Sequence, residues 1–145
     1  LPLYGHEMGG ERNLGVAEAG FGSYVKTYKP WFIGRDSFIK KELTRGGVVV
    51  RFRFLEKGVR LAHNGDPVLD SKGKVIGFVT SCAVDKDGLL TGQVFVELKY
   101  AAEGTPLFIF QGAPKQSSKA PAELHPGDRI PLPTQAVIVS RFPKL

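Results

Sequence analysis

The chain has 145 residues, a formal net charge of +6 and an isoelectric point near 9.6. This length is enough for one domain with a real core, and the single cysteine excludes an internal disulfide and fits a reducing compartment, so we expect a cytoplasmic protein. No apolar run is long enough to span a membrane, and the basic charge favours an anionic partner without choosing between nucleic acid, an acidic protein and a polycarboxylate ligand.

The first 34 residues are rich in glycine and lack a sustained period, which predicts short extended pieces joined by turns. The chain begins at Leu1 rather than at a methionine, and we expect it to be a piece of a longer protein. A short helix is predicted from Gly34, because Asp36 near its start and two lysines near its end complement the helix dipole. Gly46 and Gly47 are expected to end this helix.

Residues 48–55 show the clearest amphipathic strand pattern, with an apolar face that we expect in the core and a basic face in solvent. Phenylalanines and arginines point in opposite directions on such a strand, so they cannot share one nucleic-acid-binding surface. The expected inward face is Val48, Val50, Phe52 and Phe54, and the expected outward face is Val49, Arg51, Arg53 and Leu55.

The rest of the chain reads as short strands separated by turns. At least six strands with so few helix signals predict a mainly β fold, a closed six-stranded Greek-key barrel, with an N-terminal extension containing one short helix. Residues 111–133 are poor in strand formers and are interpreted as a long loop or insertion. The further strands are predicted at residues 59–61, 67–69, 74–80, 93–99, 107–110 and 136–142.

The sequence contains no catalytic constellation that can be recognised from spacing. His6, His63 and His125 lie far apart without a second ligand at metal spacing, so we predict no metal site. Cys82 lacks the basic setting that activates a thiol, and Ser81 lacks the G-x-S-x-G context of an esterase nucleophile. We therefore assign no catalytic residue.

Several segments, in the same order, resemble the C-terminal part of the aminomethyltransferase, or T-protein, of the glycine cleavage system. Residues 1–7 (LPLYGHE) resemble its L-Y-G-x-E segment, residues 32–36 (FIGRD) the start of a helix, and residues 77–81 (GFVTS) a strand. Residues 64–68 (NGDPV) and 103–105 (EGT) are similar to further turns of the family. Together these segments extend over most of the chain.

The resemblance implies that residues 1–45 are the tail of a folate-binding region with a connecting helix, and residues 46–145 the C-terminal barrel. The implied reaction transfers a one-carbon unit from a lipoyl-bound aminomethyl group to tetrahydrofolate with release of ammonia. The family's catalytic residues lie upstream of the Leu-Tyr-Gly segment. The fragment alone is therefore expected to be inactive and not to bind tetrahydrofolate.

Tyr4 and Glu7 are the candidate cofactor-binding residues, because their segment resembles one near the family's folate site. Taken alone, such a polar-aromatic cluster is more typical of loop packing. The implied partners are the upstream folate-binding domain of the same chain and the lipoylated H-protein. The residues themselves predict no membrane partner and disfavour nucleic acid. Cys82, which stands where the family usually has glycine, and the 111–133 insertion indicate a divergent relative.

Three other functions stay open. A basic barrel could be a pure binding module for RNA or protein, since translation factors use similar six-stranded barrels. The chain could be the tail of a folate-linked demethylase, a class of the same fold family. It could also serve only to stabilise its upstream partner.

Overall fold

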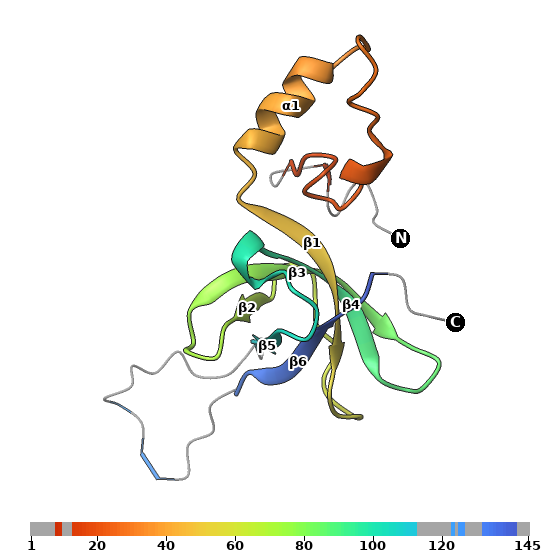
Figure 1. Cartoon of the computed structure of the whole chain (residues 1–145). Helices are drawn as coiled ribbons and strands as arrows, with labels where there is room; N and C mark the ends of the chain where they lie inside the picture. Colours follow the sequence, from red (N-terminus) through yellow and green to blue (C-terminus); the bar gives the residue numbers. More distant parts are fainter. Residues whose placement is uncertain (1–7, 10–12, 113–122, 124, 127–131, 142–145) are drawn as a thin grey trace.

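The computed structural model describes residues 8–9, 13–112, 123, 125–126 and 132–141 (Figure 1). Within these ranges six strands close into an antiparallel barrel, in the order β1-β4-β3-β2-β5-β6, and one α-helix precedes them. The structure therefore confirms the predicted fold class. The strands are β1 (Gly47–Phe54), β2 (Pro67–Leu69), β3 (Val75–Val84), β4 (Leu90–Glu97), β5 (Pro106–Ile109) and β6 (Thr134–Val139).

The barrel interior is filled by alternate side chains of its strands. Phe52, Phe54, Val94 and Val96 have no exposed surface, as predicted. The rings of Phe52 and Phe54 meet edge to face, with centroids 5.3 Å apart, a geometry that adds to the gain from burial. The ladder between β1 and β4 pairs Val50 with Val94, so both strands turn the same alternate residues inward.

The strand predicted at residues 59–61 does not form. Hydrogen bonds from side chains occupy this stretch in place of a strand ladder. The Gln111 side-chain amide donates to the Arg60 carbonyl, and the His63 N–H donates to the Asp66 carboxylate at 2.8 Å. Gln111 lies 51 positions after Arg60, so this contact leaves no local pattern, which is why the apolar residues alone suggested a strand.

The hairpin between β3 and β4 extends further than predicted, since the two strands stay paired up to the turn that joins them. Asp85 closes this turn, because its carboxylate accepts hydrogen bonds from the N–H groups of Asp87 (2.8 Å) and Leu89 (3.0 Å). Residues 83–86 thus complete the hairpin. The last strand, β6, also begins earlier than predicted, at Thr134.

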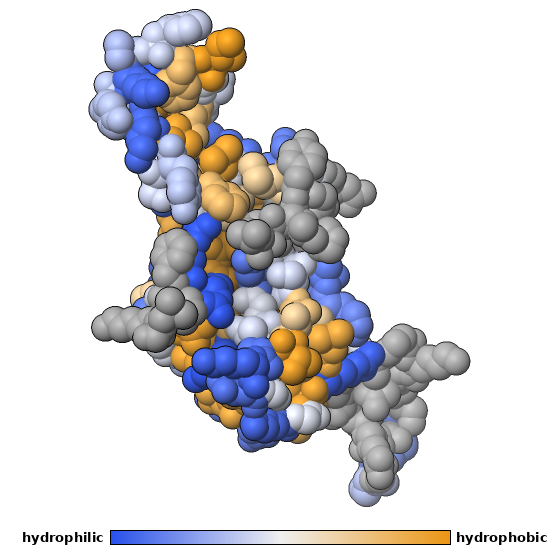
Figure 2. Space-filling model, turned by 90° about the vertical axis from the view of Figure 1, so that its right-hand side faces the viewer, coloured by the Kyte–Doolittle hydropathy of each residue, from blue (hydrophilic) through white to orange (hydrophobic). Residues whose placement is uncertain are grey.

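Residues 13–45 precede β1 in the chain and form a separate part of the structure, which we call the lobe (top of the view in Figure 2). It contains a 3-10 turn, η3 (Gly22–Tyr24), and the predicted helix, α1 (Arg35–Leu43), which Figure 1 shows standing away from the barrel. The Val49 N–H of β1 donates to the Glu18 carbonyl of the lobe at 2.6 Å. Val49, predicted on the solvated face of β1, is only 6% exposed. That prediction is wrong because the lobe covers this end of the strand.

Candidate functional site

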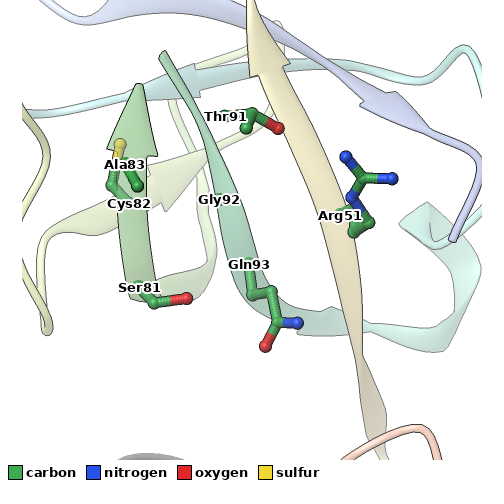
Figure 3. Close-up of a pocket in the computed structure, with 7 residues that line it drawn as sticks. All are labelled: Arg51, Ser81, Cys82, Ala83, Thr91, Gly92 and Gln93. Atoms are coloured by element: carbon green, nitrogen blue, oxygen red, sulfur yellow. The ribbon is translucent and has the colours of Figure 1, made fainter. Parts of the chain in front are cut away.

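A hollow of about 210 Å³ lies on the outer face of the barrel, over β1, β4 and β3 (Figure 3). The strand register builds it, because it sets side chains from three strands in rows across the sheet. Arg51 pairs with Gln93, and Gln93 pairs with Ser81. The hollow is lined by Arg51, Ser81, Cys82, Ala83, Thr91, Gly92 and Gln93.

Two local features of β3 and β4 shape the floor of the hollow. The register shifts between Val79 and Ser81, and the buried Thr80 at this point donates its hydroxyl to the Gln93 carbonyl at 3.2 Å. At Gly92 an added Cβ would collide with the Ser81 carbonyl oxygen and the Phe52 ring. Glycine is therefore required where the strands approach so closely, and it leaves the hollow open.

Arg51, Ser81 and Gln93 supply polar side chains to the hollow. The Arg51 Nη1 donates to the Ser140 carbonyl at 3.3 Å, which holds the guanidinium against the end of β6. The Gln93 Oε1 is buried and has no hydrogen-bond partner in the part of the chain that the structure describes. The Ser81 hydroxyl lies beside it on the paired strand.

Cys82 lines the hollow and also packs against the barrel core. Burial raises the pKa of its thiol, so the thiol is protonated at neutral pH. A protonated thiol is a weak nucleophile, so the structure gives no support for Cys82 as a nucleophile.

A second polar cluster closes the turn between β2 and β3. The Asp70 carboxylate accepts hydrogen bonds from the N–H groups of Lys72 (2.8 Å) and Lys74 (3.0 Å) and from the Tyr100 hydroxyl (3.1 Å). The bond from the Lys74 N–H is the main cause that holds the pKa of Asp70 below its usual range. These bonds stabilise the turn, and we assign the cluster a structural role.

Among the described residues, no group of three or more His, Cys, Asp and Glu side chains could hold a metal ion. Of the three histidines singled out in the sequence, His6 lies outside the described residues and His125 is exposed. The Nδ1 of His63 lies 4.0 Å from the Oδ2 of Asp66. The helices that the structure describes are too short or too polar to cross a membrane.

The candidate cofactor residues Tyr4 and Glu7 lie outside the described residues, so their assignment stays a prediction. The hollow was missed by reading the sequence. Arg51, Ser81 and Gln93 come from three strands, and only the register brings them together. The bulge at Thr80, which sets that register, has no local sequence signal.

Comparison with known proteins finds curated relatives of this chain, although no protein-family model matches it. The aminomethyltransferase of Alkaliphilus oremlandii is 38% identical over 114 residues, which are 75% of this chain and 29% of that protein. The aminomethyltransferase of Koribacter versatilis is 43% identical over 84 residues, 56% of this chain and 20% of its own length.

A solved structure shows the same fold. The glycine cleavage system aminomethyltransferase T from Bartonella henselae superposes with a TM-score of 0.66 at 16% identity, over 90% of this chain and 32% of that one. The fold is a small, closed antiparallel barrel with a hollow on its outer face. Its sequence identity to curated aminomethyltransferases and its fold make the chain a relative of the C-terminal region of the aminomethyltransferase, or T-protein, family. It spans less than a third of the length of the curated relatives that it matches.

Proposed function

We propose that the chain is the C-terminal region of a tetrahydrofolate-dependent aminomethyltransferase. The reaction passes a one-carbon unit from a lipoyl-bound aminomethyl group to tetrahydrofolate and releases ammonia. The observation that carries the proposal is the 38% identity over 114 residues to a curated aminomethyltransferase. The matching fold of a T-protein supports it.

In this proposal the chain alone has no activity, because the catalytic residues belong to an upstream folate-binding domain. Residues 1–45 are the tail of that domain with a connecting helix, and residues 46–145 are the barrel. Tyr4 and Glu7 contact tetrahydrofolate in the assembled protein, which the resemblance of residues 1–7 to the family segment supports. The lipoylated H-protein is the partner that carries the aminomethyl group, and the cytoplasm is the compartment that the single cysteine favours.

A chimera tests this proposal. In the Alkaliphilus oremlandii aminomethyltransferase, the 114 residues that match are replaced by this chain; we call this protein the chimera. We expect the chimera to form methylene-tetrahydrofolate from the aminomethyl-loaded H-protein, and the parent truncated before these residues to form none. Tyr4→Phe and Glu7→Gln in the chimera should raise the tetrahydrofolate concentration needed for half-maximal rate. An inactive chimera that is folded, beside an active parent, would contradict the proposal.

A further inference from the structure

We propose that Asn64 is a site of spontaneous deamidation, and that the fold slows this reaction through one backbone hydrogen bond. The site lies in the turn of residues 62–66, which leads into β2 and takes no part in the hollow. The proposal is independent of the proposed function, because it rests on the chemistry of this turn alone.

The sequence directs deamidation to one position. The reaction begins when the backbone nitrogen of the following residue attacks the side-chain amide carbon of an asparagine. A side chain on the following residue hinders this approach, and glycine has none. The chain has two asparagines: Asn13 is followed by Leu14, and Asn64 by Gly65. Asn64 is therefore the reactive one.

The reaction of Asn64 needs only water and hydroxide. Hydroxide removes the proton of the Gly65 N–H, the nitrogen forms a bond to the Asn64 Cγ, and the Cγ–Nδ2 bond breaks. Ammonia leaves with a proton from water, and a succinimide ring remains. Water then opens the ring at the side-chain carbonyl to give aspartate, or at the backbone carbonyl to give isoaspartate. Either product adds one negative charge at neutral pH.

The structure gives the Gly65 N–H a hydrogen-bond acceptor in β3. Asn64 and Gly65 are both exposed, yet the Gly65 N–H donates to the Val79 carbonyl at 2.8 Å. The Val79 N–H donates in turn to the Asp66 carbonyl at 2.9 Å, so the turn continues the pairing of β2 with β3. A backbone N–H held in this way loses its proton only when the hydrogen bond opens, as in hydrogen exchange. Attack on Asn64 therefore requires the turn to open.

Asp66 holds the turn closed. Its carboxylate accepts a hydrogen bond from the His63 N–H at 2.8 Å, and its own N–H donates to the His63 carbonyl at 3.1 Å. These two bonds bridge the turn across Asn64 and Gly65. Gly65 has a φ of +99°, a conformation that glycine adopts without strain. Loss of the Asp66 carboxylate should therefore increase the open fraction of the turn.

The two products of deamidation differ in their effect on the barrel. Isoaspartate adds one carbon atom to the main chain just before Gly65, so the bonds that Gly65 and Asp66 make with Val79 no longer fit together. Val79 has no exposed surface, and the register shift that shapes the floor of the hollow lies between Val79 and Ser81. Aspartate leaves the main chain unchanged. The isoaspartate form should therefore be the less stable of two products with the same charge.

Peptide mapping by mass spectrometry tests the protection. The folded chain and a synthetic peptide of residues 60–69 are incubated in the same mildly alkaline buffer, with and without urea. Asn64 should deamidate more slowly in the folded chain than in the peptide, by about tenfold, the factor that one hydrogen bond supplies. Urea should remove the difference, and Asn13 should stay intact in both conditions. Equal rates in the folded chain and the peptide, or protection that persists in urea, would overturn the proposal.

The variant Asp66→Ala tests what closes the turn. Its rate is compared with that of a peptide carrying the same substitution, which corrects for the changed neighbouring residue. Most of the protection should be lost in the folded variant. Protection equal to that of the unmodified chain would contradict the role of the Asp66 carboxylate.

Hydrogen exchange of the Gly65 amide gives a readout that does not involve deamidation. Gly58 is the matched control, because it is also exposed and its N–H has no hydrogen-bond partner within the described ranges. The Gly65 amide should exchange more slowly than the Gly58 amide, by a factor similar to the protection of Asn64. Equal exchange of the two amides would refute the hydrogen bond as the cause of protection.

A comparison of the two products tests the effect on stability. Chain deamidated in urea is refolded and separated by chromatography into its aspartate and isoaspartate forms, with Asn64→Asp as the reference for the aspartate form. The isoaspartate form should unfold at a lower urea concentration than Asn64→Asp, or fail to refold where Asn64→Asp succeeds. Equal unfolding midpoints would show that the turn tolerates the longer main chain and would overturn this part of the proposal.

Discussion

Replacing Phe52 with alanine removes the aromatic centre of the barrel and tests the inward register of β1. Phe52 has no exposed surface, and its ring meets that of Phe54 edge to face at 5.3 Å. The substitution leaves a cavity that the closed barrel cannot easily collapse, because strands on both sides are paired. A large-to-small change of this kind costs about 3–5 kcal/mol, of which the ring pair accounts for about 0.5–1.5 kcal/mol.

The assay is urea unfolding followed by far-ultraviolet circular dichroism, since the sole tryptophan lies on the lobe and does not report on the barrel. A domain of this size has a free energy of unfolding of about 5–15 kcal/mol, so Phe52→Ala should come close to unfolding it. Arg53→Ala, on the exposed face of the same strand, is the control and should change the free energy by less than about 0.5 kcal/mol. A loss below about 1 kcal/mol for Phe52→Ala would refute the register.

Three further predictions follow from contacts in the structure. Gly92→Ala should destabilise the barrel strongly, because the added Cβ would collide with backbone, whereas Gly46→Ala, with open space around it, should be neutral. The midpoints of denaturant unfolding compare the two variants, and equal midpoints would refute the close approach of the strands at Gly92. The pKa of Asp70 is lowered in the fold, so its contribution to stability is present at neutral pH and is lost as pH falls through the folded pKa. Asp70→Asn should therefore flatten the acid limb of a stability–pH curve, and an unchanged limb would contradict this. The aromatic side chains of β1 are buried on the face opposite its arginines, so we expect no change in the electrophoretic mobility of labelled RNA at low salt. A clear, salt-sensitive mobility shift would favour the binding-module alternative.

The sequence predicted the strands of the barrel wherever a strand carries its own alternation of apolar and polar residues. In β1 the alternation of apolar and basic residues predicted that Phe52 and Phe54 enter the core, because a period of two is a property of the strand alone. The number and spacing of the strands predicted a closed barrel, whereas the order of the strands in it comes from the structure. The acidic start and basic end of α1 likewise predicted the helix.

What the sequence could not predict depends on contacts between distant segments. The burial of Val49 comes from the Glu18 carbonyl and its neighbours, which lie about thirty positions earlier in the chain. The loop at residues 59–61 depends on Gln111, and the hollow depends on the bulge at Thr80.

The central proposal is that this chain is the C-terminal region of a protein that binds tetrahydrofolate. Calorimetric titration of tetrahydrofolate into the chimera, with the intact Alkaliphilus oremlandii parent and the isolated chain beside it, tests it most directly. The account predicts binding by the chimera with an affinity similar to the parent's and no binding by the isolated chain. A folded chimera that takes up no tetrahydrofolate while the parent does, or an isolated chain that binds as tightly as the parent, would contradict it.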